Sequence, residues 1–306
     1  MLSLLLAAPS ATPYVTLNNG VQMPAVAAGT WQYTTSGAQE SVTNAIKAGF
    51  THIDTAHDYC ADGTTGDCTN SGSSNQVGIG RALADVERSK FFLTTKVPGC
   101  GLQGISRDKC GADSVKAALK NLDELGLDYV DLLLVHFPPG KALPDPGGCS
   151  ADNCGVMQEQ WHALSSLVAQ ATPCPTQPDT THSSAAAFAS RTIQYIHYSL
   201  LSARRGALAT AQPPHSPSSL VRFLSASPRT LPRLQNKTRA LGVSNFCSGC
   251  LECLAKPAGA LTPAVNQFKY HIGMGTDPIG LLSYCKANGI VPQAAASPLL
   301  CRRAAL

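Results

Sequence analysis

Residues 122–136 read LDELGLDYVDLLLVH, and this stretch decides the fold. Its second half contains the run Val130–Val135, which is apolar apart from Asp131. Such a run suits a strand that is buried on both faces, as parallel sheets require. Its first half ends a candidate helix over residues 112–125. The stretch therefore predicts a helix followed by a buried parallel strand.

Strand and helix candidates alternate on both sides of this stretch. Expected strands are 25–31, 51–54, 91–96, 130–136, 240–244, 264–268 and 290–295, and expected helices are 38–48, 75–84, 112–125, 157–169, 248–255 and 278–287. Seven strands with helices between them predict an α/β fold of the (β/α)8 TIM-barrel type. We expect the eighth strand and the C-terminal segment to be lacking, because the chain stops at Leu306. Ahead of the first strand, Thr16–Met23 predicts a hairpin with Asn19-Gly20 as its turn.

Residues 173–235 interrupt the alternation. They hold eight of the 21 prolines and three of the eight histidines, and no durable periodicity runs through them. A structureless stretch of this length is improbable as a packed element of a compact domain. We expect a low-complexity insertion without fixed structure, either a flexible loop or a coding artefact, and a functional surface insertion is the alternative. The predicted parts are a leader at 1–13, barrel parts at 14–172 and 236–306, and the insertion between them.

The composition describes a globular protein with 44% hydrophobic and 14% charged residues, which can bury a large core. A net charge of +4 without a dense Lys/Arg tract argues against a nucleic-acid partner. No run approaches the ~20 apolar residues of a spanning helix. The apolar start, MLSLLLAA, has no basic region and barely reaches the ~7 residues that a signal peptide core needs. We expect a cytoplasmic monomer with no membrane partner.

Twelve cysteines are many for a cytosolic enzyme. Six lie in close pairs around loop-like stretches: Cys60/Cys68, Cys100/Cys110 and Cys149/Cys154. Disulfides at these pairs would point to the secretory pathway, and free thiols would fit a reducing cytosol. Both interpretations stay open. Three further cysteines, at 247, 250 and 253, share one helix face without the fourth cysteine of an iron–sulfur run, so we expect no metal.

Seven short motifs in a fixed order carry a family resemblance. They are GFTHIDTAHDY at 49–59, TTK at 94–96, LDELGLDYVD at 122–131, LLLVHFP at 132–138, GVSNF at 242–246, VNQ at 265–267 and AASPL at 295–299. With these motifs the chain resembles the aldo-keto reductases over residues 14–170 and 237–300. One such motif would be weak evidence, and seven in order are strong. The resemblance implies a TIM-barrel reductase of aldehydes or ketones that uses NADPH.

The resemblance implies a catalytic set made of Asp54, Tyr59, Lys96 and His136. Reducing a carbonyl requires hydride at its carbon and a proton at its oxygen. A phenol, with an ordinary pKa near 10, stays protonated and can supply that proton, and a neighbouring ammonium lowers its pKa. We expect Tyr59 to donate the proton, Lys96 to tune it, Asp54 to orient Lys96, and His136 to hydrogen-bond the substrate oxygen. All four follow predicted strand ends, where barrel enzymes build their sites.

The resemblance also implies a site for NADPH or NADP+. Its predicted residues are Gly29, Thr30 and Trp31 in the wall, Asp54 beside them, Ser244, Asn245 and Gln267 at the nicotinamide carboxamide, and Ser297 and Leu299 near the pyrophosphate. Trp31, His136 and Phe137 would line the pocket of a small-molecule carbonyl substrate, with Phe137 in place of the tryptophan that many members carry.

Two departures from the family pattern put cofactor binding in doubt. Ala296 stands where the family commonly has a tyrosine that stacks on the nicotinamide. The basic segment that grips the adenosine 2′-phosphate is not present before Leu306, and no Gly-x-Gly-x-x-Gly fingerprint replaces it. Two alternatives therefore stay open: a catalytically impaired barrel fragment that cannot hold cofactor, and a secreted, disulfide-stapled binding module on the same fold.

Overall fold

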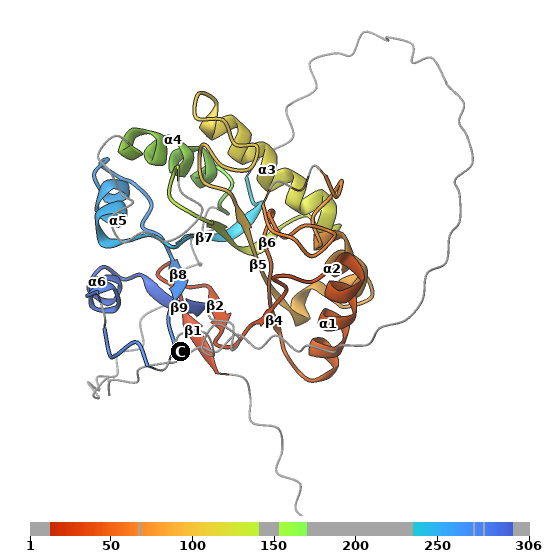
Figure 1. Cartoon of the computed structure of the whole chain (residues 1–306). Helices are drawn as coiled ribbons and strands as arrows, with labels where there is room; N and C mark the ends of the chain where they lie inside the picture. The colour runs from red at the N-terminus through yellow and green to blue at the C-terminus, as the bar shows by residue number, and fades with distance from the viewer. Residues whose placement is uncertain are drawn as a thin grey trace, which may run out of the picture.

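The computed structural model of the protein describes residues 13–140, 153–169 and 235–295, apart from positions 67, 69, 272 and 278. Seven parallel strands within these ranges form one curled sheet, and each pairs with its neighbour in sequence (Figure 1). They are β3 (Ala28–Gly29), β4 (His52–Asp54), β5 (Phe92–Val97), β6 (Val130–Val135), β7 (Thr238–Ser244), β8 (Val265–Lys269) and β9 (Val291–Ala295). This sequential order is that of a TIM barrel, and it confirms the predicted fold class.

Helices cover the outer face of the sheet (Figure 1). They are α1 (Thr35–Lys47), α2 (Gln76–Leu83), α3 (Cys110–Leu125), α4 (Cys154–Ser165), α5 (Ser248–Ala255) and α6 (Leu281–Ala287), with a short 3-10 turn, η1 (Arg88–Lys90). Each predicted helix is present, with ends shifted by a few residues. In α3, Ala117, Asn121 and Leu125 are buried at a spacing of four, so one face of the helix meets the sheet. The helix ends at Gly126, whose φ of 67° suits a residue without Cβ.

Alternation along each strand decides which side chains enter the barrel. All six residues of β6 are buried, which confirms the prediction that both faces of this strand are covered, and all six residues of β5 are buried as well. Leu133 and Val135 belong to the large core between sheet and helices. Leu132 and Leu134 belong to a smaller cluster inside the curl of the sheet. Successive side chains of a strand point to opposite faces, so one sequence run builds both cores.

An N-terminal hairpin packs into the interior cluster. Its strands, β1 (Tyr14–Thr16) and β2 (Gln22–Pro24), pair antiparallel, and Leu17 and Met23 join the interior apolar residues. The turn is not the predicted two-residue Asn19-Gly20. The Gly20 N–H donates to Leu17 O, which centres the turn on Asn18 and Asn19 and leaves Gly20 behind it at a φ of 84°. The Asn18 and Asn19 side chains donate to backbone carbonyls at 263 and 239, so the turn is set by contacts that the sequence does not display.

The chain on either side of the predicted insertion comes together in space. The Ala169 N–H donates to Thr238 O at 2.9 Å, and the Lys237 N–H donates to Leu167 O at 2.9 Å. Residues 170–234, which contain nearly all of the predicted insertion, lie outside the described residues. The barrel therefore passes from α4 to β7 at a point where the two ends of this segment are already hydrogen-bonded neighbours.

Disulfides follow the predicted pairs in two cases and not in the third. Cys60 bonds Cys68, and Cys100 bonds Cys110. The predicted partner of Cys154 is wrong, because Cys154 bonds Cys253 and so links the start of α4 to α5 across 99 positions of sequence. The two helices are neighbours on the barrel surface, and this packing brings the Cα atoms of Cys154 and Cys253 to 5.7 Å from each other. Over the described part of the chain, no helix is long and apolar enough to cross a membrane.

Candidate active site

The ends of β4 and β5 deliver two charged side chains to the barrel interior. Ile53 and Leu93 pack in the outer core, so Asp54 and Lys96, one and three positions further along their strands, point inward. The pairing of Asp54 with Thr94 sets β4 and β5 side by side near their carboxyl ends. The strand period thus places an acid and a base together at the end of a barrel where catalytic groups are ordinarily built.

Lys96 joins three parts of the site. Its Nζ donates to Asp54 Oδ1 at 2.5 Å, to Thr55 O at 2.9 Å and to the Tyr59 hydroxyl at 3.3 Å. The lysine side chain is 0% exposed. Burial lowers the pKa of Lys96, but the charge of Asp54 and the contact with Tyr59 raise the pKa by more than burial lowers it. The net pKa of Lys96 therefore lies above its usual range. The side chain is a buried ammonium held by a carboxylate and aimed at a phenol.

The Tyr59 pKa departs from the expected direction. Burial, the largest influence, raises the pKa of Tyr59, and Lys96 lowers it as predicted. The charges of Asp54 and Asp58 raise it again, so the net pKa lies above the ordinary value of 10. The prediction overlooked this burial. The phenol therefore stays fully protonated near neutral pH, and its phenolate depends on the Lys96 charge for stability.

His136 follows β6 and is held by a carboxylate that the sequence analysis missed. Its Nδ1 donates to Asp58 Oδ1 at 2.7 Å. The ring stacks on Phe137 with centroids 4.3 Å apart, and meets Tyr59 edge-on at 5.8 Å. Burial raises the pKa of Asp58, but the charge of His136 and its hydrogen bond lower the pKa by more than burial raises it. The net pKa of Asp58 therefore lies below its usual range. The signal was present as a carboxylate directly before Tyr59, but nothing in the sequence shows that it faces the end of β6.

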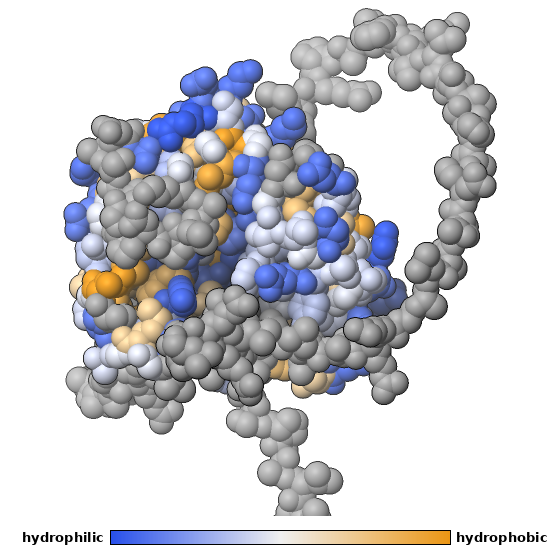
Figure 2. All heavy atoms as spheres, in the orientation of Figure 1, coloured by the Kyte–Doolittle hydropathy of each residue, from blue (hydrophilic) through white to orange (hydrophobic). Residues whose placement is uncertain are grey.

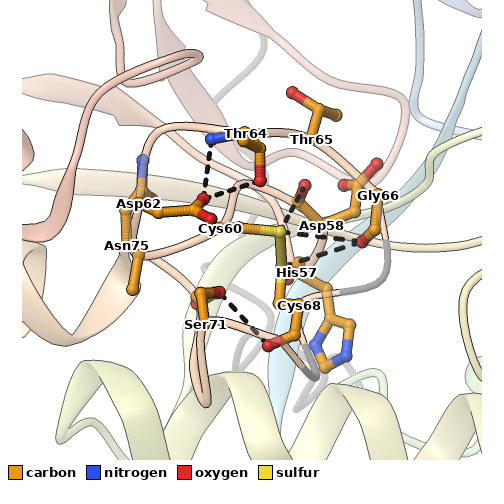
Figure 3. Close-up of a disulfide and its surroundings, with 12 residues drawn as sticks. His57, Asp58, Cys60, Asp62, Thr64, Thr65, Gly66, Cys68, Ser71 and Asn75 are labelled. Atoms are coloured by element: carbon orange, nitrogen blue, oxygen red, sulfur yellow. Dashed lines mark hydrogen bonds between the residues drawn. A yellow bond between two sulfur atoms is a disulfide. The ribbon is translucent and has the colours of Figure 1, made fainter.

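A disulfide-bonded loop follows Tyr59 directly (Figure 3). The loop closes through the Cys60–Cys68 disulfide, and Asp62 accepts hydrogen bonds from Thr64 N at 2.9 Å and Thr64 Oγ1 at 2.6 Å. His57 points away from the disulfide toward α3, where its Nδ1 lies 2.6 Å from Asn121 Oδ1. The crosslink begins one residue beyond the phenol, so it restrains the backbone that carries Tyr59.

The predicted cofactor-binding residues surround Asp54. Gln267 Nε2 donates to Asp54 Oδ2 at 2.7 Å, and Asn245 Nδ2 donates to His136 O at 3.0 Å. Thr30 Oγ1 donates to Asp54 O at 3.2 Å, and Gly29 pairs with Asp54 between β3 and β4. Ser244, at the end of β7, accepts from Asn245 Nδ2 at 3.0 Å. Four of the predicted positions are thus linked directly to Asp54 or His136, and Ser244 is linked to them through Asn245.

The remaining predicted positions differ in their placement. Trp31 lies beyond β3, is 38% exposed and donates from Nε1 to Thr65 Oγ1 at 2.8 Å, so it rests on the loop that follows Tyr59. Ser297 and Leu299 lie outside the described residues, as does Ala296. Figure 2 shows that the face in view is hollowed near its centre and that hydrophilic residues gather in the hollow.

Comparison with known proteins bears on this arrangement. The family model described as "Aldo/keto reductase family" matches residues 25–170, which include Asp54, Tyr59, Lys96 and His136. Residues 25–170 of the chain belong to the aldo-keto reductase family. The match ends at 170, one residue beyond the last described residue before the predicted insertion.

Similar aldo-keto reductases include a glycerol 2-dehydrogenase (NADP(+)) of Saccharomyces cerevisiae, which is 29% identical over 286 residues. That alignment covers 92% of this chain and 67% of the yeast protein. An NADH-dependent D-xylose reductase of Candida parapsilosis is 32% identical over 176 residues. That alignment covers 53% of this chain and 49% of the Candida protein. The chain thus spans about two thirds of the length of the yeast relative.

Solved aldo-keto reductase structures share the fold. One from Brucella melitensis has a TM-score of 0.55 at 24% identity and covers 92% of this chain and 70% of its own. Another, from Bombyx mori and in complex with NADP, has a TM-score of 0.53 at 21% identity and covers 93% and 66%. At these identities the likeness concerns the barrel architecture alone.

Proposed function

We propose that the chain reduces an aldehyde or ketone to the alcohol with hydride from NADPH, and that Tyr59 donates the proton. The observation that carries the proposal is the buried cluster in which Lys96 Nζ contacts both Asp54 and the Tyr59 hydroxyl. His136 lies edge-on to the same phenol and completes a group of donors around one point. The match to the aldo-keto reductase family and the similarity to the yeast glycerol 2-dehydrogenase (NADP(+)) add support.

The side chains near β7 and β8 fit a nicotinamide carboxamide. Asn245 and Gln267 each use their amide N–H groups within the protein. Among the described residues, neither Asn245 Oδ1 nor Gln267 Oε1 accepts a hydrogen bond, so both oxygens are available to an amide N–H of a ligand. We assign these two residues and Ser244 to the carboxamide, and Gly29, Thr30 and Trp31 to the adjoining wall. When bound, the cofactor would supply the hydride.

The side chains of the protein would then supply the proton to the carbonyl oxygen. His136 and Tyr59 would hold the carbonyl oxygen, and the phenol proton would pass to that oxygen as it gains negative charge. An alkoxide is a stronger base than a phenolate, so the transfer runs toward the alcohol. Lys96 would stabilise the phenolate left on Tyr59, and Asp54 would keep the ammonium in place. Phe137, stacked on His136, would form an apolar wall of the substrate pocket.

The substitution Tyr59→Phe tests the proton donor. Loss of a general acid costs ~10²–10⁴-fold in rate, so we expect carbonyl reduction to fall at least a hundredfold while NADPH affinity stays within about twofold. Tyr129→Phe is the matched control, because that ring packs against Arg88 ahead of β6, whereas His136 follows the other end of this strand. Steady-state rates and NADPH fluorescence titrations measure both effects. A Tyr59→Phe variant within threefold of the parent rate would contradict the assignment.

A barrel that cannot hold cofactor is the rival function, favoured by Ala296 in place of a stacking aromatic. Titration of the chain with NADPH separates the two. Quenching of protein fluorescence with micromolar or tighter affinity supports the reductase, and no saturable binding up to millimolar NADPH supports the rival.

A further inference from the structure

The carboxylate of Asp58 is buried beside the site and takes no part in the proposed proton transfer. Its side chain is 0% exposed, and Oδ1 accepts from His136 Nδ1 at 2.7 Å. Its other oxygen, Oδ2, is buried without a hydrogen-bond partner among the described residues. A buried carboxylate with one hydrogen bond is costly unless a positive charge lies beside it. The buried carboxylate of Asp58 therefore restricts which protonation states the His136 ring can adopt.

The hydrogen bond to Asp58 decides which nitrogen of His136 can meet a substrate. An ionised carboxylate only accepts hydrogen bonds, so Nδ1 must carry a proton. Within the described chain, Nε2 makes no hydrogen bond and is the nitrogen left for a ligand. A neutral ring with its proton on Nδ1 presents a lone pair at Nε2, which repels a carbonyl oxygen. Only the ring with both protons presents an N–H there.

We propose that Asp58 is a positioning residue that keeps a proton on His136 Nδ1, so that His136 donates to the substrate carbonyl from Nε2 only as an imidazolium. The inference rests on the proposed reductase function. It adds a pH control to that function: carbonyl reduction requires a proton on the Asp58–His136 pair beyond the one that Tyr59 transfers.

Other charged groups around the pair do not titrate in its place. Lys96 is bound to Asp54, and its pKa lies above the usual range, so it stays charged. Tyr59 stays neutral because its pKa lies above 10. His57, the neighbour of Asp58 in sequence, turns its ring to Asn121 of α3. The groups that contact His136 from β7 and from Phe137 are uncharged.

The substitution Asp58→Asn separates this role from general support of the fold. An asparagine amide can donate to Nδ1, which moves the proton of the neutral ring to Nε2 and restores a donor without charge. We expect kcat/KM of the parent chain for carbonyl reduction to fall with rising pH, approaching tenfold per pH unit once the pair loses its extra proton. In Asp58→Asn this fall should vanish. At acidic pH, where the parent pair keeps its proton, the variant should be roughly tenfold slower, because a neutral donor makes a weaker hydrogen bond than a charged one.

Asp62→Asn is the matched control. Asp62 lies in the same loop and accepts a hydrogen bond from Thr64 instead of His136. Its substitution removes the same charge as Asp58→Asn. We expect its pH profile to match the parent chain. An Asp58→Asn variant that keeps the parent's alkaline fall, or an Asp62→Asn variant that loses it, would overturn the proposal.

Nitrogen-15 NMR of His136 without substrate or cofactor tests the pairing independently of activity. We expect the neutral ring to carry its proton on Nδ1 in the parent chain and on Nε2 in Asp58→Asn. A parent ring protonated at Nε2 refutes the inference even if Asp58→Asn fails to fold. If the chain reduces no carbonyl, the proposed function fails, and the NMR result still decides whether Asp58 sets the proton of His136.

Discussion

Replacing Asp54 by asparagine should destabilise the protein severely, because it leaves a buried ammonium without its counter-ion. The Lys96 side chain is 0% exposed and that of Asp54 is 2% exposed. After the substitution, Lys96 Nζ keeps two neutral partners, Thr55 O and the Tyr59 hydroxyl. Neither compensates a full charge in a dry interior.

Breaking a buried ion pair by removing one partner costs ~3–5 kcal/mol. For a domain above 150 residues, each kcal/mol corresponds to a Tm change of ~2–4 °C, so a loss of about 4 kcal/mol predicts a decrease of about 8–16 °C. Lys96→Met should cost a similar amount, because it strands the carboxylate. The double variant Asp54→Asn/Lys96→Met should be more stable than the sum of the single losses predicts, by at least ~1 kcal/mol.

Thermal and urea unfolding, followed by tryptophan fluorescence, measure the cycle. Lys120→Met is the matched control, since the Lys120 side chain is 52% exposed and lies 3.6 Å from Glu124, and an ion pair with such a solvent-exposed lysine is worth at most ~1 kcal/mol. The account of the site is wrong if either single variant loses less than ~1 kcal/mol of unfolding free energy. It is also wrong if the loss in the double variant equals the sum of the two single losses, because the interior would then accommodate the isolated charge.

Two further predictions concern the covalent and chain connections of the barrel. Cys253→Ser opens a disulfide that spans 99 positions; loop closure of that size is worth up to ~4.7 kcal/mol, so urea unfolding without reductant should show a loss of at least ~2 kcal/mol. Reduction of the parent chain should cost at least as much, because it also opens the Cys60–Cys68 and Cys100–Cys110 disulfides. Replacing residues 170–234 by a short Gly-Ser linker should raise the free energy of unfolding by ~2 kcal/mol under reducing conditions, because Ala169 and Lys237 already lie in one hydrogen-bonded junction. Failure of this variant to fold would show that the segment contributes to the barrel.

Much of the architecture could be predicted because its signals are local. The run Val130–Val135 is apolar apart from Asp131, and this pattern is typical of a parallel strand that is covered on both faces. The helices were predictable from apolar spacing, and their ends moved by a few residues because caps depend on neighbours. The hairpin turn was misplaced for the same reason, since side-chain bonds from Asn18 and Asn19 to distant carbonyls select it.

The candidate site divides in the same way. Asp54 and Lys96 were predictable because each ends a strand, and adjacent parallel strands bring their carboxyl ends together. Asp58 was not, because its partner His136 lies 78 positions away and the loop that turns the carboxylate toward it has no periodic pattern. The net rise in the pKa of Tyr59 also depends on burial, which is a property of the assembled barrel.

The sequence by itself determined the order of the strands, the identity of the groups at their ends and the family. Each of these depends on residue type and short-range spacing, which survive without knowledge of contacts. Only the tertiary structure decided which cysteine meets Cys154, which carboxylate holds His136, and how far burial outweighs Lys96 at the Tyr59 hydroxyl. Those outcomes depend on distances between residues far apart in the chain, because Coulomb and hydrogen-bond energies act through space and take no account of sequence separation.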